Sequence, residues 1–114
     1  MTTARIDYVE LPNATAHELT RGFYAKAFGW EFTDYGPDYS ATTNGTTDVG
    51  LNGQPDESLS APLPVVRVGN LEAAFDSVVA SGGTIAKPIF AFPGGRRFHF
   101  IDPAGSELAV WSES

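Results

Sequence analysis

The sequence predicts an α+β fold built from two tandem modules, each with the order strand–helix–strand–strand–strand. Two helical patterns each end at a glycine, and these residues, Gly29 and Gly83, are 54 positions apart. Short β-like segments surround both helices. The glycines of two tight turns, Gly45 and Gly105, are 60 positions apart. Both spacings are close to half of the 114-residue chain, which indicates an internal duplication.

The first module begins with an alternating segment, residues 5–12, which predicts a strand with Tyr8 and Glu10 on one face. The spacing of Thr15 and Glu18 is typical of a helix-capping box, and we expect His17 beside them to be exposed. The helix then places its apolar residues on one face: Leu19, Phe23, Ala27 and Phe28. Three further strands are predicted at 30–35, 38–43 and 46–51, with an Asn44-Gly45 hairpin turn between the last two.

The second module repeats this order. Residues 63–68 predict a strand, and Asn70 is a favourable N-cap for the helix that follows. Strands are predicted at 84–92, 96–101 and 107–111, and the Asp102 carboxylate is expected to bind amides of the turn before the last strand. We therefore place module one at about 4–52, a polar linker at 53–60 and module two at about 61–113.

Composition excludes several classes of function. The absence of cysteine excludes disulfides, thiolate zinc sites and iron–sulfur clusters, and His17 and His99 are too few for a three-histidine metal site within one chain. The formal charge is −7, with no basic cluster beyond Arg96-Arg97, so we expect no nucleic-acid partner. No apolar run approaches the ~20 residues of a membrane span, so we also expect no membrane partner and a cytoplasmic protein.

Several motifs resemble one known superfamily. They are Phe23-Tyr24, the Phe28-Gly29-Trp30-Glu31-Phe32 junction, Val68 to Ala74, Ser81-Gly82-Gly83, Pro93 to Arg97 and Phe100 to Ser106. Together, in this order, they are similar to the vicinal oxygen chelate superfamily, which includes glyoxalase I, extradiol dioxygenases and bleomycin-resistance proteins. The resemblance covers nearly the whole chain. It implies an open, cupped, eight-stranded mixed sheet with the helices outside and a cavity inside.

The positions that correspond to metal ligands in that superfamily do not carry metal-binding residues here. By this resemblance they are Tyr8 on the first strand, Leu63 at the start of the second module and Ala109 on the last strand. A divalent metal needs about three or more nitrogen, oxygen or sulfur ligands. We therefore expect no metal and no other cofactor.

Strand alternation predicts which side chains face the cavity. If Tyr8 faces inward, Glu10 does so as well, and the same reasoning applies to Arg67 in the second module. Alternatively, the charged residues pair with one another or face solvent. His99 lies on the strand before the Asp102 turn and could act as a general base or a metal ligand. The predicted ligand-binding residues are Tyr8, Glu10, Arg67, His99, Glu107 and Trp111.

The sequence therefore favours a metal-free, glyoxalase-like homodimer that binds a small apolar or aromatic molecule in its cupped sheet. Two alternatives remain open. One is a metal-dependent lyase or dioxygenase with a displaced site formed by Glu10, His99 and Glu107. The other is a dimeric interaction module whose cup is filled by its own side chains.

Overall fold

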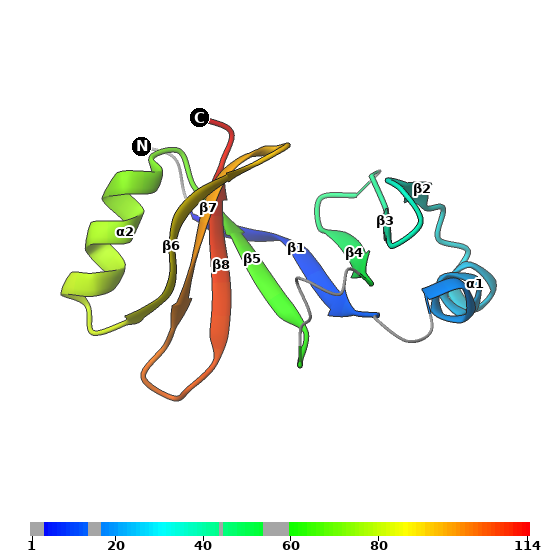
Figure 1. The fold of residues 1–114 in the computed structure, drawn as a ribbon, viewed down its shortest axis with the longest axis horizontal. Coiled ribbons are helices and arrows are strands. Elements are labelled where there is room, and N and C mark those ends of the chain that lie inside the picture. Colours follow the sequence, from blue (N-terminus) through cyan, green and yellow to red (C-terminus); the bar gives the residue numbers. More distant parts are fainter. Residues whose placement is uncertain (1–3, 14–16, 44, 54–59) are drawn as a thin grey trace. The chain divides into compact units, whose positions relative to one another are not determined.

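The computed structural model describes residues 4–13, 17–43, 45–53 and 60–114. These residues form eight strands and two helices (Figure 1), which confirms the α+β class and the duplicated element order. The elements are β1 (Arg5–Pro12), α1 (His17–Phe28), β2 (Thr33–Asp34), β3 (Tyr39–Ala41), β4 (Asp48–Asn52), β5 (Leu63–Arg67), α2 (Leu71–Ala80), β6 (Thr84–Phe92), β7 (Gly95–Ile101) and β8 (Glu107–Ser112). None of the helices in this part of the chain is long and apolar enough to cross a membrane.

The chain divides into two compact units, which are described separately. The N-terminal unit spans Tyr8–Leu63, and the C-terminal unit combines Met1–Asp7 with Pro64–Ser114. Strand β1 contributes its first residues to one unit and its remaining residues to the other. The predicted linker, 53–60, lies mostly outside the described residues.

In the N-terminal unit, β1 pairs in parallel with β4, from Tyr8 opposite Asp48 to Pro12 opposite Asn52. Strand β4 pairs antiparallel with β3, which pairs antiparallel with β2. The short β2 corrects the strand predicted at 30–35, because Trp30 joins an aromatic cluster instead. Its ring stacks on Tyr24 of α1 with centroids 5.1 Å apart.

Helix α1 does not have the buried apolar face that its sequence pattern suggested. It contains no buried residue, and Leu19, Phe23 and Phe28 are 80%, 59% and 63% exposed. Its aromatic side chains contact each other and Trp30, with Phe23 edge-on to Tyr24 at 5.1 Å. The predicted cap, Thr15, lies outside the described residues.

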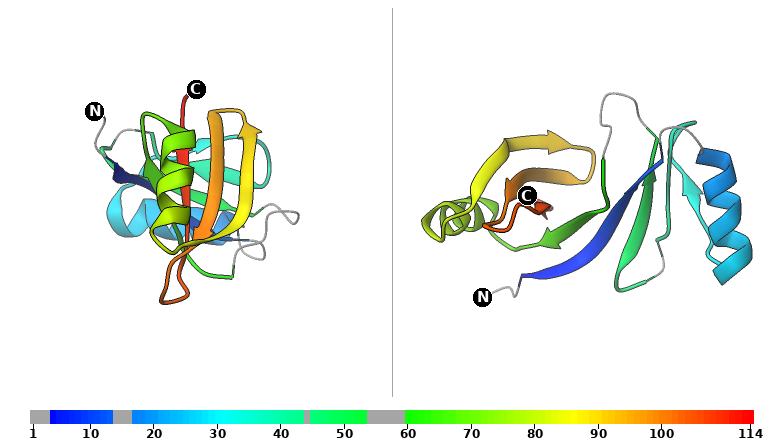
Figure 2. Two further views of the ribbon diagram at one scale, coloured as in Figure 1. Left: turned by 90° about the vertical axis from the view of Figure 1, so that its left-hand side faces the viewer. Right: turned by 90° about the horizontal axis from the view of Figure 1, so that it is seen from below.

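In the C-terminal unit the strand order is β5–β8–β7–β6, with β5 and β8 parallel and the remaining pairs antiparallel. Helix α2 lies against one face of this sheet, as both views in Figure 2 show. Its N-cap is Asn70, whose side-chain oxygen accepts a hydrogen bond from the Ala73 amide at 3.0 Å, as predicted. The predicted Asp102 turn also forms, because Asp102 Oδ1 accepts from the amides of Ala104 and Ser106, each at 2.9 Å.

Alternation along these strands gives the sheet two chemically different faces. Between α2 and the sheet, Leu71 of the helix packs with Phe98 of β7 and Val110 of β8 in a buried apolar cluster. On the opposite face, Trp111 is the register partner of both Arg67 and Arg97, and Ala109 is the partner of His99. Because successive side chains alternate between faces, the second set points away from α2. The polar candidates of this unit therefore share one face.

Candidate functional site

Trp111 is held on the face opposite α2 by three neighbours. The guanidinium carbon of Arg67 lies 4.8 Å from the Trp111 ring centroid, a cation–π contact. Phe92 packs edge-on at 6.1 Å, and the indole Nε1 donates to Asp7 Oδ1 at 3.1 Å. Arg67 is also paired with Glu113, with 2.8 Å between Nη2 and Oε1. The indole is therefore fixed by contacts at its edge, face and nitrogen.

His99 lies at the centre of a hydrogen-bonded chain on the same face. The side chain is 1% exposed, and its Nε2 is 2.8 Å from Arg97 Nη2 while its Nδ1 is 2.8 Å from Glu107 Oε2. Arginine can only donate, so Nε2 accepts and Nδ1 carries the proton that is donated to Glu107. Both ring nitrogens of His99 are therefore engaged in hydrogen bonds with neighbouring side chains.

Arg97 also contacts aromatic rings on this face. Its guanidinium carbon lies 5.6 Å from the Phe90 centroid and 5.7 Å from the Phe92 centroid. Phe90 is 38% exposed, so an aromatic surface remains accessible beside the arginine. The face therefore combines aromatic rings, guanidinium groups and the His99–Glu107 pair.

Burial lowers the pKa of His99, and the hydrogen bond from Nδ1 to Glu107 only partly opposes this. Below about pH 6.5 His99 binds a proton in the unfolded chain. In the folded protein its lowered pKa keeps the side chain neutral to a lower pH. We therefore expect the free energy of unfolding to fall as the pH decreases below about 6.5. Urea unfolding at a series of pH values measures this. In a His99→Gln variant the dependence between about pH 5 and 7 should weaken, and an identical slope in both proteins would contradict the assignment.

A second polar cluster lies in the N-terminal unit around Glu10, which is 3% exposed. The Tyr39 hydroxyl donates to Glu10 Oε2 at 2.9 Å, and Asn52 Nδ2 donates to Oε1 at 3.1 Å. The hydroxyls of Tyr8 and Tyr39 are 2.5 Å apart. Burial raises the pKa of Tyr8 to about 12, and burial together with the Glu10 charge also raises the pKa of Tyr39. Both phenols are therefore protonated at neutral pH.

The structure thus brings the predicted residues together in pairs. Tyr8 and Glu10 share Tyr39 in the N-terminal unit, while Arg67 contacts Trp111 and His99 contacts Glu107 in the C-terminal unit. Sequence reasoning did not identify Tyr39, Asn52, Phe92 or Arg97. Arg97 could have been identified from the sequence, because a residue two positions before His99 on a strand lies on the same face of the sheet.

His17 is half-buried, which corrects the expectation that it is exposed. Its Nδ1 is 2.7 Å from Asn13 Nδ2, and its Nε2 is 3.0 Å from Ser40 Oγ. The Ser40 hydroxyl donates in turn to Asp34 Oδ1 at 2.6 Å. Ser40 therefore directs its proton towards a carboxylate, and the network ties the start of α1 to β2 and β3.

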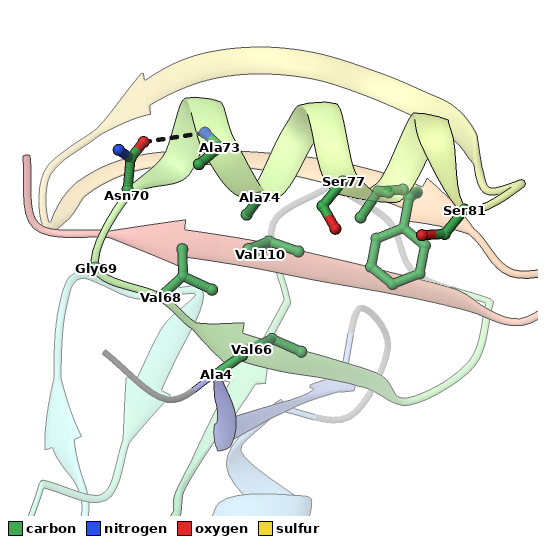
Figure 3. A pocket seen from close by; sticks show the side chains of 12 residues that line it. Ala4, Val66, Val68, Gly69, Asn70, Ala73, Ala74, Ser77, Ser81 and Val110 are labelled. Atoms are coloured by element: carbon green, nitrogen blue, oxygen red, sulfur yellow. Dashed lines mark hydrogen bonds between the residues drawn. The ribbon is translucent and has the colours of Figure 1, made fainter. Parts of the chain in front are cut away.

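A separate apolar groove of about 730 Å³ runs beside α2 (Figure 3). The close-up shows Val66, Val68 and Val110 of the sheet region on one side and Ala74 and Ser77 of the helix on the other. Its other lining residues are Ala4, Gly69, Asn70, Ala73, Val78, Ser81 and Phe100. None of the predicted ligand-binding residues lines this groove.

The donor set does not fit the metal that the resemblance implies. Across the described residues, no three histidine, cysteine, aspartate or glutamate side chains come together in a way that could hold a metal ion. At the corresponding family positions, Leu63 and Ala109 have no donor atom in their side chains, and the Tyr8 phenol is hydrogen-bonded to Tyr39.

Comparison with known proteins decides the family. The family model of the Glyoxalase/Bleomycin resistance protein/Dioxygenase superfamily matches residues 5–110. The chain belongs to this superfamily. Among curated members, the putative glyoxylase CFP32 of Mycobacterium bovis and of Mycobacterium tuberculosis is 29% identical over 116 residues. The match covers 92% of this chain but 44% of the relative, so the chain spans less than half of their length.

Solved structures show the superfamily fold. Methylmalonyl-CoA epimerase from Mycobacterium tuberculosis matches with a TM-score of 0.75 at 12% identity, covering 96% of this chain and 87% of that one. The Mn(II)-bound glyoxalase from Novosphingobium aromaticivorans matches with a TM-score of 0.66 at 19% identity, covering 97% of this chain and 40% of that one. A superfamily member from Vibrio splendidus gives 0.66 at 18% identity and covers 98% of both chains. At these identities the likeness concerns the fold alone.

Proposed function

We propose that this superfamily member binds a small apolar or aromatic molecule, without a metal ion, on the sheet face opposite α2. The observation that carries the proposal is the group of rings and guanidinium planes around Trp111. Arg67 lies 4.8 Å from the Trp111 ring and Phe92 lies 6.1 Å from it. The proposal also includes two expectations from the sequence, namely that the protein is a homodimer and that it is cytoplasmic.

Such a surface suits a planar ligand. Aromatic rings and guanidinium groups offer flat faces on which a second ring can stack, while a few polar groups fix its orientation. On this face Arg67 has a side-chain exposure of 36%, and Glu107 has 40%. Both can contact a ligand while remaining close to their present partners.

The chain contains two tryptophans, Trp30 and Trp111, which allows a matched fluorescence test. We expect 2-naphthoate, a planar aromatic carboxylate, to quench the wild type and Trp30→Phe, in which Trp111 is the only tryptophan. In Trp111→Phe, where only Trp30 emits, the quenching should be lost. Calorimetry of Trp111→Ala should show that 2-naphthoate binds at least about tenfold more weakly. The reason is that stacking of a planar ring on an aromatic side chain contributes about 1–3 kcal/mol.

Two controls separate the alternatives. Cyclohexanecarboxylate, which has no aromatic ring, should bind more weakly than 2-naphthoate. Treatment with EDTA should leave the affinity for 2-naphthoate unchanged, whereas loss of binding after EDTA and its return with Mn²⁺ would support the metal-dependent alternative. Equal affinity of the wild type and Trp111→Ala would overturn the proposed position of the ligand.

A further inference from the structure

We propose that the Tyr8 hydroxyl is a hydrogen-bond-accepting binding site in the N-terminal unit, for a ligand that offers a hydroxyl or N–H donor. The residues that define it are Tyr8, Tyr39 and Glu10, linked in that order by hydrogen bonds of 2.5 Å and 2.9 Å. This site does not depend on the aromatic-ligand site proposed for the C-terminal unit.

The direction of the hydrogen bonds follows from the number of protons available. Glu10 accepts on both carboxylate oxygens, from Tyr39 and from Asn52, which is the pattern of an ionised carboxylate. The single Tyr39 proton is therefore committed to Glu10. Between the two tyrosine oxygens, 2.5 Å apart, the proton must then come from Tyr8. Tyr8 has no second proton, so its oxygen can only accept from a further partner.

The site also requires the residue that lies beneath it. A Cβ atom at Gly50 would lie 2.0 Å from the Tyr8 hydroxyl oxygen and 2.3 Å from the Tyr39 hydroxyl oxygen. Only glycine leaves room for the two hydroxyls to meet at this position of β4. Tyr8 is half-buried while Glu10 is 3% exposed, so the chain of hydrogen bonds leads from a half-buried tyrosine to a buried carboxylate.

The buried charge strengthens the acceptor. A hydrogen bond to an ionised group is shorter and stronger than one between neutral groups, and linked hydrogen bonds polarise each other. The Tyr8 oxygen is thus a better acceptor than an isolated phenol. A ligand that presents only acceptor atoms meets no proton at this position, so the site selects for donors.

The test compares phenol, which has a hydroxyl donor, with anisole, in which a methyl group replaces the hydroxyl proton. We expect wild-type protein to bind phenol about tenfold more tightly than anisole, the effect of one hydrogen bond to the Tyr8 oxygen. In Tyr39→Phe the Tyr8 proton is released and can turn towards the ligand, so the phenol-to-anisole ratio should fall to about twofold or less. Tyr24→Phe is the control variant, because Tyr24 lies in the aromatic cluster of α1, and its ratio should equal that of the wild type.

The same measurements in a Trp111→Ala background separate this site from the aromatic-ligand site. An unchanged ratio in that background supports the Tyr8 site whether or not 2-naphthoate binding is lost. Equal binding of phenol and anisole by the wild type, or no binding of phenol at millimolar concentration, would overturn the proposal. Proton NMR of the ligand-free protein gives a second readout. The wild type should show downfield hydroxyl resonances from both Tyr8 and Tyr39, whereas Tyr8→Phe should keep only that of Tyr39, which donates to Glu10. Identical downfield resonances in the two proteins would overturn the proposal.

Discussion

Replacing Gly95 by alanine is expected to destabilise the protein by about 2–4 kcal/mol, because the site combines steric overlap with backbone strain. An added Cβ would lie 2.1 Å from the carbonyl oxygen of Ser112 and 3.0 Å from the Cα of Glu113, both backbone atoms that cannot rotate away. The residue has φ +154°, which side-chain-bearing residues rarely adopt. Relief would require β7 and β8 to separate at the register pair of Arg96 and Ser112.

Urea unfolding measures this effect, and Gly22→Ala is the matched control. Gly22 lies within α1, and nothing lies within 4 Å of an added Cβ there. That substitution should stabilise the protein by up to about 1 kcal/mol, since alanine favours the helix more than glycine does. A Gly95→Ala variant as stable as the wild type would mean that β7 and β8 do not approach as described.

Replacing Phe98 by alanine is expected to cost about 3–5 kcal/mol, the range for removing a fully buried aromatic side chain. Phe98 is 0% exposed and belongs, with Leu71 and Val110, to the apolar cluster between α2 and the sheet. Its ring lies edge-on to Phe75 of α2, with centroids 5.1 Å apart. The substitution therefore leaves a cavity between the helix and the sheet as well as removing apolar surface from the core.

Phe23→Ala provides the comparison for Phe98→Ala. Phe23 is 59% exposed, so its removal should change the free energy of unfolding by less than about 1 kcal/mol. Differential scanning calorimetry of the two variants gives both values under one set of conditions. Similar losses at the two positions would show that the apolar cluster beneath α2 is not the main core of the C-terminal unit.

The fold class and the local features of the chain could be predicted from the sequence because they depend on short-range signals. The Asn70 cap and the Asp102 turn are set by residues three or four positions apart, and both form as expected. Helix α1 shows the limit of this reasoning. Its apolar spacing predicts a buried face, but burial depends on what the rest of the chain places against the helix.

The site was predictable in its residue types but not in its pairings. Strand alternation placed His99 and Glu107 among the candidates, yet their contact depends on the register between β7 and β8, in which Ile101 lies opposite Glu107. The sequence predicts the Asp102 turn that joins these strands, but it does not define their register residue by residue. The hydrogen bond between His17 and Ser40 joins residues 23 positions apart, so Ser40 could not be identified as the partner of His17 from sequence spacing.

The position of β8 within its sheet has a consequence for the order of folding during synthesis. Strand β8 lies between β5 and β7, so β5 has no parallel partner within this unit until Glu107–Ser112 have been made. About forty further residues are synthesised between the end of β5 and the start of β8. At about 5–20 residues per second, their synthesis takes a few seconds. During that interval the backbone groups on the β8 side of β5 have no partner strand.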